Sequence, residues 1–315
     1  MPRFTGQRPP VSPVVIGPLV LILSTLAFAQ APRGASIRDT VIYLAPDTTS
    51  TKMANLDRGR EIIILETARD WVHVEAPLTE EKVVTGWIPA KGVVSASTPD
   101  GDKILFGEAV DSEDQASQRH GRRGAAQDAM HLYYRVADYF PNSPLAAEAM
   151  YRSADIRWQI DKADVMSRPS AKERDPHLRE GMDEQYMKEV IKKFPATKWA
   201  DLAALRLIDN KLCGDWQGET RCPEKEAELY EKFAADHSPS NVTAEALYEA
   251  AWRRSALIEM YKTENQPKKS EESRAKAVAL AQKAAQIPQS DWAARAERLL
   301  FMIQQGIPAY GNAEE

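Results

Sequence analysis

The pattern of apolar and polar positions changes near residue 99. Between residues 37 and 98, short runs rich in valine and isoleucine alternate with turn-forming residues. In one of these runs Val72 and Val74 alternate with Trp71 and His73, which is the period of a strand with one buried face. Comparable runs span residues 41–44, 61–65 and 85–88. This part of the chain is predicted to be a small β module.

From residue 102 to 310 alanine, glutamate, lysine, leucine and arginine dominate, which favours helix. Four segments align without gaps around a shared serine or threonine and carry an alanine six residues later. A hydroxyl at that place predicts an N-cap, and the small residue predicts a close helix contact, so each copy is a helix–turn–helix. The shared residues are Ser143, Thr197, Ser240 and Ser290, followed by Ala149, Ala203, Ala246 and Ala296.

The first residues are typical of a secretory signal peptide. Arg3 and Arg8 precede an apolar stretch, and small residues at Ala27 and Ala29 predict cleavage between Ala29 and Gln30. The apolar stretch is shorter than the roughly 20 residues of a membrane span, so no stable span is expected after cleavage. The alternative is an uncleaved anchor. The predicted location is periplasmic or secreted.

These patterns predict the domain organisation. The chain divides into a signal peptide (1–29), a β domain (30–98), a linker or first helix (99–124), a helical repeat domain (125–310) and a disordered tail (311–315).

Composition narrows the classes of function. The chain has 41 Lys and Arg against 46 Asp and Glu, a net charge of −5, so nucleic acid is not expected as a partner. Its five histidines are scattered, no catalytic motif is present, and the glycine-rich loops that bind dinucleotides and nucleoside triphosphates are absent. The prediction is a protein without enzymatic activity, cofactor or metal.

Cys213 and Cys222 are the two cysteines of the chain, and turn-forming residues separate them. In an exported protein this arrangement favours a local disulfide. Two unpaired thiols are one alternative. A zinc site is the other, although it would need two more ligands and the nearest histidine, His237, stands alone.

Several short motifs of the β module occur in the order that is typical of one family. They are Leu44-Ala45-Pro46, Leu56-Asp57-Arg58-Gly59, Ile64-Leu65-Glu66, Trp71-Val72-His73-Val74 and Gly86-Trp87-Ile88-Pro89. In these motifs, residues 37–98 resemble the bacterial SH3-like domain. The resemblance implies a small β-barrel that attaches exported proteins to cell-wall peptides or envelope proteins. Trp71 and Trp87 are its candidate ligand contacts, with core packing as the alternative for at least one of them.

The repeated turn, with its alanine at the sixth position, resembles tetratricopeptide-like repeats of envelope proteins such as the outer-membrane-assembly lipoprotein and the Tol-Pal-associated coordinator protein. The resemblance implies an all-α superhelix after the barrel. The chain departs from that family in two ways: its repeats are longer than the usual length of about 34 residues, and no cysteine near the predicted cleavage site can carry a lipid.

Together these features predict a periplasmic adaptor whose helical groove binds envelope proteins or peptides, with the β domain as a tether. The alternative is a peptidoglycan-recognising module that regulates cell-wall remodelling, which would make peptidoglycan the partner. Aromatic side chains on the helices before the shared turns are the candidate partner contacts, with ordinary packing as the alternative for each one. They are Tyr133, Tyr134, Tyr186 and Tyr230.

Overall fold

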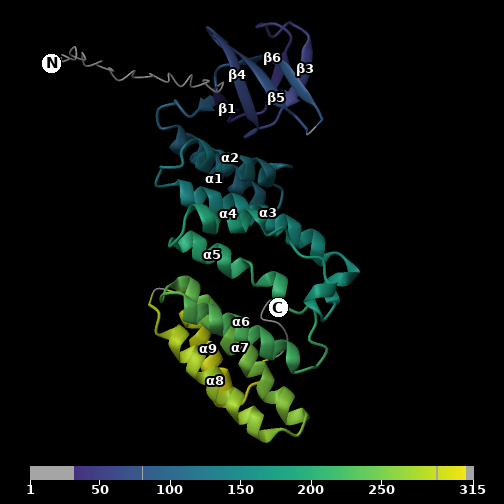
Figure 1. Ribbon diagram of the computed structural model, residues 1–315, viewed down its shortest axis with the longest axis vertical. Coiled ribbons are helices and arrows are strands. Elements are labelled where there is room, and N and C mark those ends of the chain that lie inside the picture. Colours follow the sequence, from purple (N-terminus) through teal and green to yellow (C-terminus); the bar gives the residue numbers. More distant parts are fainter. Residues whose placement is uncertain (1–31, 80, 289, 310–315) are drawn as a thin grey trace, which may run out of the picture. The chain divides into compact units, whose positions relative to one another are not determined.

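The computed structural model describes residues 32–79, 81–288 and 290–309. The predicted signal peptide, the cleavage site and the predicted tail lie outside these residues. Within them the chain forms seven strands followed by nine α-helices (Figure 1). None of these helices has the length and apolar character needed to cross a membrane.

The strands form one antiparallel sheet with the order β3-β2-β6-β5-β4-β1-β7. The four predicted runs fall in β2, β4, β5 and β6. The buried face of the sheet is apolar, and it includes Ile42, Ile62, Val74 and Ile88. The strands are β1 (Arg33–Ser36), β2 (Thr40–Tyr43), β3 (Lys52–Leu56), β4 (Glu61–Ala68), β5 (Trp71–Pro77), β6 (Val83–Pro89) and β7 (Val93–Ser95).

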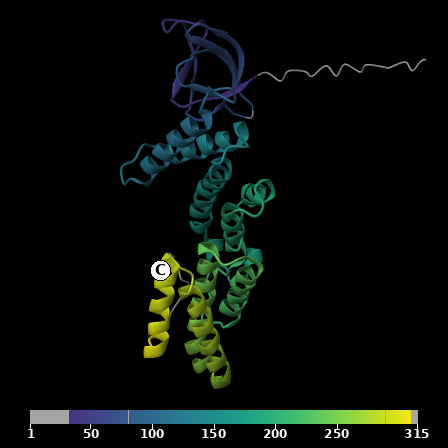
Figure 2. The same cartoon turned by 90° about the vertical axis from the view of Figure 1, so that its left-hand side faces the viewer.

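Most consecutive helices of the chain pack against each other, as α1 does on α2, α2 on α3, and α7 on α8 (Figure 2), and the exception is α5, which packs on α7 more than on α6. Short 3-10 helices η1 (Pro169–Lys172), η2 (Pro176–Leu178) and η3 (Asp209–Lys211) occupy the longer connections. The helices are α1 (Gly101–Ser117), α2 (Ala125–Tyr139), α3 (Ala146–Met166), α4 (Gln185–Lys193), α5 (Lys198–Arg206), α6 (Arg221–Asp236), α7 (Asn241–Thr263), α8 (Pro267–Ala285) and α9 (Asp291–Gln305).

The predicted fold class, a small SH3-like barrel followed by a tetratricopeptide-like superhelix, is wrong because the sheet is open. Its end strands β3 and β7 do not pair with each other. Instead Ala35 of β1 and Val94 of β7 are buried in a cluster with residues of α1 and α2. The Tyr139 hydroxyl on α2 also donates a hydrogen bond to the Gly34 carbonyl at 2.7 Å. Helices therefore cover this end of the sheet, where closure of a barrel would need strand pairing.

The predicted N-caps are confirmed at three of the four turns. The side-chain oxygens of Thr197, Ser240 and Ser290 each accept a hydrogen bond from a backbone N–H of the helix that follows, at 3.2 to 3.3 Å. At the first turn, Leu145 occupies the cap position of α3. Ser143 accepts a hydrogen bond from the Leu145 backbone N–H at 3.1 Å, so it organises the turn from two residues earlier.

The shared alanines are buried as the repeat predicts. Ala149, Ala203, Ala246 and Ala296 are each 0% exposed, and each belongs to a different hydrophobic cluster of the helical region. A methyl side chain at these positions lets the neighbouring helix approach closely. The four copies of the repeat therefore have the same structural role.

Candidate functional site

The candidate contact tyrosines fall into two groups, and the first is buried. The hydroxyl of Tyr133 donates to Glu113 at 2.6 Å and accepts from Arg152 at 3.0 Å. The ring of Tyr230 lies beneath the Arg253 guanidinium, 4.6 Å from its central carbon. Burial raises the pKa of both hydroxyls. Both side chains lie in the helical core and offer no surface to a partner.

The second group, Tyr134 on α2 and Tyr186 on α4, is half-buried and lines one cleft of about 290 Å³. An arginine stacks on each ring. The central guanidinium carbon of Arg135 lies 5.3 Å from the Tyr134 ring centre, and that of Arg157 lies 4.1 Å from the Tyr186 ring centre. We call this site the aromatic–arginine cleft. Its lining is Met130, His131, Tyr134, Arg135, Ser153, Arg157 and Tyr186.

His131 lies in this cleft under the turn between β3 and β4. Gly59 in that turn has a φ of +74°, and a Cβ there would come 2.8 Å from the Cβ of His131, so the turn packs directly on the histidine. Burial lowers the pKa of His131 to about 4, and the positive charges of Arg60 and Arg135 add to the effect. The imidazole is therefore neutral at physiological pH.

A larger groove of about 660 Å³ lies between α6, α7 and α8. Its surface includes Ala234, Leu247, Ala279, Leu280 and Ile287, so apolar groups dominate. Alanine leaves more space between neighbouring helices than a longer side chain would. We call this site the α6–α8 groove.

Charged side chains border the α6–α8 groove. Lys276 and Lys283 are exposed and make no ion pair with a described residue. Glu231 on α6, by contrast, accepts a hydrogen bond from Arg254 at 2.7 Å, so its charge is already compensated. The groove therefore combines an apolar floor with two available positive charges.

The candidate tryptophans lie on the face of the sheet opposite its buried cluster. Trp71 on β5 meets Tyr43 edge to face at 5.8 Å, and Trp87 on β6 stacks on His73 at 4.7 Å. All four side chains are half-buried. Neither tryptophan belongs to the buried cluster of the sheet, so this face presents a row of aromatic rings.

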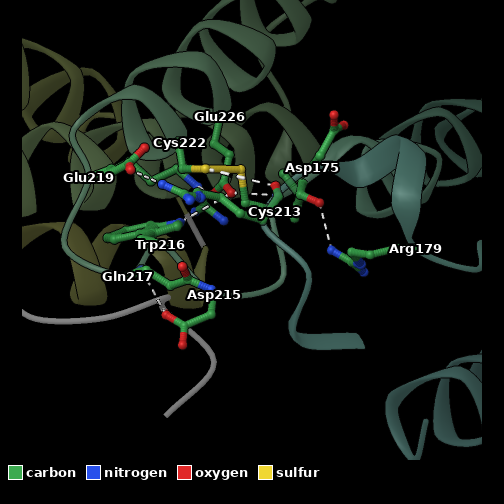
Figure 3. The surroundings of a disulfide bond; sticks show 12 residues. Asp175, Arg179, Cys213, Asp215, Trp216, Gln217, Glu219, Cys222 and Glu226 are labelled. Carbon is green, nitrogen blue, oxygen red and sulfur yellow. Dashed lines mark hydrogen bonds and ion pairs between the residues drawn. A yellow bond between two sulfur atoms is a disulfide. The ribbon is translucent and has the colours of Figure 1, made fainter. Parts of the chain in front are cut away.

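The structure contains the predicted disulfide between Cys213 and Cys222, which links the segment after η3 to the first turn of α6 (Figure 3). Next to it lies Glu226, whose side chain is 2% exposed. One oxygen of this carboxylate accepts hydrogen bonds from the Cys213 backbone N–H at 2.9 Å and from the Trp216 indole at 3.2 Å. The other oxygen accepts from Arg253 Nε at 2.7 Å. Every oxygen of the carboxylate is thus used inside the fold, which indicates a structural role.

No group of three or more His, Cys, Asp or Glu side chains that could hold a metal ion occurs in the described part of the chain.

No family model matches the chain, and no curated protein matches it. Among solved structures, the chain is similar to a protein described as "DHF58 filament", with 18% identity over 65% of this chain and 91% of that chain, at a TM-score of 0.24. It is also similar to the de novo designed helical repeat protein DHR64, with 20% identity over 65% of this chain and 94% of that chain, at a TM-score of 0.19. Scores this low carry no argument about fold or function.

Proposed function

We propose that this protein is a non-enzymatic adaptor of the bacterial cell envelope that holds a segment of a partner protein in the α6–α8 groove. The observation that carries the proposal is the groove itself. Its volume of about 660 Å³ and its apolar floor suit several side chains of a bound peptide.

The charges on the groove specify the partner segment. Lys276 and Lys283 are seven residues apart on α8, which corresponds to two helical turns or roughly 10 Å on one face. A segment that places apolar side chains on the floor and carboxylates beside these lysines would complement both features. The expected partner is therefore a segment of alternating apolar and acidic character.

The envelope location is part of the proposal and rests on the sequence. The signal-peptide pattern of residues 1–29 supports it, and a disulfide between Cys213 and Cys222 suits an oxidising compartment. The intact mass of the exported protein tests it. Cleavage after Ala29 would support a released protein. Retention of residues 1–29 in a membrane fraction would instead indicate that the protein is anchored.

Site-specific crosslinking tests the groove. A photoreactive amino acid at Ala279, an exposed position that lines the groove, should crosslink to a partner in the native envelope. The same group at Ala294, exposed on α9 outside the groove, is the matched control. Ala279→Phe should fill the groove and abolish binding of the identified partner, while Ala294→Phe should not. Equal crosslinking from both positions would reject the groove as the binding site.

The aromatic face of the sheet favours a second candidate function, the recognition of peptidoglycan. Half-buried rings such as Trp87 and His73 offer flat surfaces for sugar or peptide groups. Binding of the full chain to purified cell-wall sacculi tests this function. Trp87→Ala should reduce binding, and Phe301→Ala, which removes a 56% exposed ring on α9, should not. If both variants bind as the parent does, the aromatic face is not a wall-binding site.

A further inference from the structure

We infer that the aromatic–arginine cleft is a binding site for a carboxylate carried on a small apolar group. This inference goes beyond the proposed function, because the cleft is formed by α2, α3 and α4 and shares no lining residue with the α6–α8 groove. Four features of the described residues carry it: an uncompensated arginine, its orientation, the local positive field, and the size of the cleft.

Arg157 is the uncompensated arginine. It makes no ion pair with a described carboxylate, and its Nε atom is buried without a hydrogen bond to a described residue. Arg135 in the same cleft also has a buried Nε atom without a hydrogen bond to a described residue, but its Nη1 atom lies 3.2 Å from Asp138 and 3.5 Å from Glu61, so its charge is compensated. Because no described carboxylate compensates the charge of Arg157, a ligand carboxylate at its terminal guanidinium nitrogens would gain a charge-assisted hydrogen bond.

Tyr186 fixes the orientation of this arginine. The central guanidinium carbon lies 4.1 Å from the ring centre, which places the charge over the aromatic face. A guanidinium held in this way keeps its N–H groups in a rigid planar fork that matches the two oxygens of a carboxylate. Because the arginine is already ordered, less side-chain entropy is lost when the ligand binds.

Positive charges outnumber negative ones in their effect on His131, although Arg60 and Arg135 also pair with carboxylates. Arg60, Arg135 and Arg157 each act on His131 in the direction of a positive field, and Asp57 opposes them. His131 also lines the cleft, and its neutral imidazole has one N–H that is able to donate a hydrogen bond to a bound oxyanion.

The size of the cleft limits the rest of the ligand. A volume of about 290 Å³ suits a group no larger than one or two amino-acid residues. Met130, Tyr134 and Tyr186 supply apolar walls beside the charged end. The shared chemistry is therefore a carboxylate next to one aromatic or aliphatic group. It could be supplied by a free small acid or by the last residue of a peptide.

Ligand-observed NMR titration of the full chain tests the inference with defined probes. N-acetylphenylalanine represents the small acid, and a pentapeptide ending in phenylalanine represents the peptide terminus. N-acetylphenylalaninamide lacks the carboxylate, and inorganic phosphate is an anion without the apolar group. Both carboxylate probes should bind and the other two should not. Tighter binding of the pentapeptide would assign the site to a peptide terminus, and equal binding would assign it to small acids.

Matched variants locate the binding. Arg157→Gln should weaken binding of N-acetylphenylalanine by about ten- to a hundredfold, because a charge-assisted hydrogen bond is lost. Arg157→Lys keeps the charge but loses the planar fork, and should weaken binding by less. Arg123→Gln changes the same charge at an exposed position between α1 and α2 and should bind as the parent does. The inference is overturned if the amide binds as well as the acid, if phosphate binds as tightly, if no carboxylate probe binds, or if the Arg157 and Arg123 variants bind alike.

Discussion

Replacing His131 with glutamine should reduce the acid sensitivity of the fold. In the folded chain the pKa of His131 is lowered to about 4 from the ordinary value of 6.5, mainly by burial. As the pH falls below 6.5, the unfolded chain takes up a proton on this imidazole and the folded chain does not. The unfolded state is thereby favoured. This contribution to stability is fully present above pH 6.5 and is lost progressively as the pH falls towards 4.

The lowered pKa sets the size of the effect. Each unit of difference between the folded and unfolded pKa corresponds to about 1.4 kcal/mol. Between pH 7.5 and pH 5 most of the unfolded chains become protonated at this site and few folded ones do, which amounts to about 2 kcal/mol. His131 retains partial contact with solvent, so this figure is an upper value. Glutamine takes up no proton over this range, so the His131→Gln variant should lack this pH-dependent change in the free energy of unfolding.

Urea unfolding at pH 7.5 and pH 5 measures this difference. From pH 7.5 to pH 5, the free energy of unfolding of the parent should fall by about 2 kcal/mol more than that of His131→Gln. This difference does not depend on how stable the variant is at pH 7.5. His177→Gln is the matched control, because this imidazole is exposed on η2 and meets water in both the folded and the unfolded chain. If His131→Gln shows the same pH dependence as the parent, the histidine is not held neutral in the cleft, and its part in carboxylate binding fails as well.

The same unfolding assay checks three further substitutions. Glu226→Gln should cost about 3 kcal/mol because it leaves the buried Arg253 without one of its charged partners, and a cost below about 1 kcal/mol would contradict the buried ion pair. Ala203→Leu should cost about 1 to 3 kcal/mol by overpacking a side chain that is 0% exposed, and an unchanged midpoint would contradict the repeat alignment. Replacing both Cys213 and Cys222 with serine should cost about 2.5 kcal/mol by releasing a short loop, and a neutral result would show that the loop is held without the disulfide.

The helix starts could be predicted from the sequence because their determinants are local. A hydroxyl at Thr197 or Ser240 caps the helix that begins at the next residue. The alanine six residues later is buried because the helical period places it on the face next to the neighbouring helix. Even at Ser143, where the helix begins later, the same hydroxyl holds the turn. Features of this kind depend on a few consecutive residues, so the sequence alone predicts them.

The open sheet could not be predicted in the same way. Strand β3 lacks a regular alternation of polar and apolar residues and buries only Leu56, and β7 has three residues, so neither gives a clear signal. Pairing of Gly34 with Ser95 joins residues that are far apart in the sequence. Whether such a sheet closes or ends against a helix depends on which surface buries Ala35 and Val94. In this fold α1 and α2 bury them, and both helices lie outside the β module.

The environments of the tyrosines could not be predicted from the sequence either. Tyr133 and Tyr134 are neighbours on α2, and one helical step of about 100° separates their directions. Tyr133 meets Glu113 and Phe106 on α1, whereas Tyr134 faces Arg135 and the cleft. Residue type alone leaves partner contact and core packing open for both, and the positions of the neighbouring helices separate them.

Glu226 was missed although the sequence holds a signal for it. It lies four residues after Cys222 and four before Tyr230, and both of these side chains are buried. A carboxylate on the apolar face of a helix has to find partners inside the fold. The partner Arg253 lies 27 residues away on α7, so the pairing needs the tertiary structure even where the buried charge could have been suspected.

The two recesses of the helical region arise from equivalent parts of the repeat. The aromatic–arginine cleft is lined by α2, α3 and α4, and the α6–α8 groove by α6, α7 and α8, so each recess is formed by two helices that precede shared turns and the helix between them. Different side chains at these positions give one recess an aromatic and cationic lining and the other an alanine-rich floor. Because no described residue lines both, a substitution such as Arg157→Gln perturbs one recess without touching the other. The carboxylate site and the partner groove are therefore separable, and failure of either assignment leaves the evidence for the other unchanged.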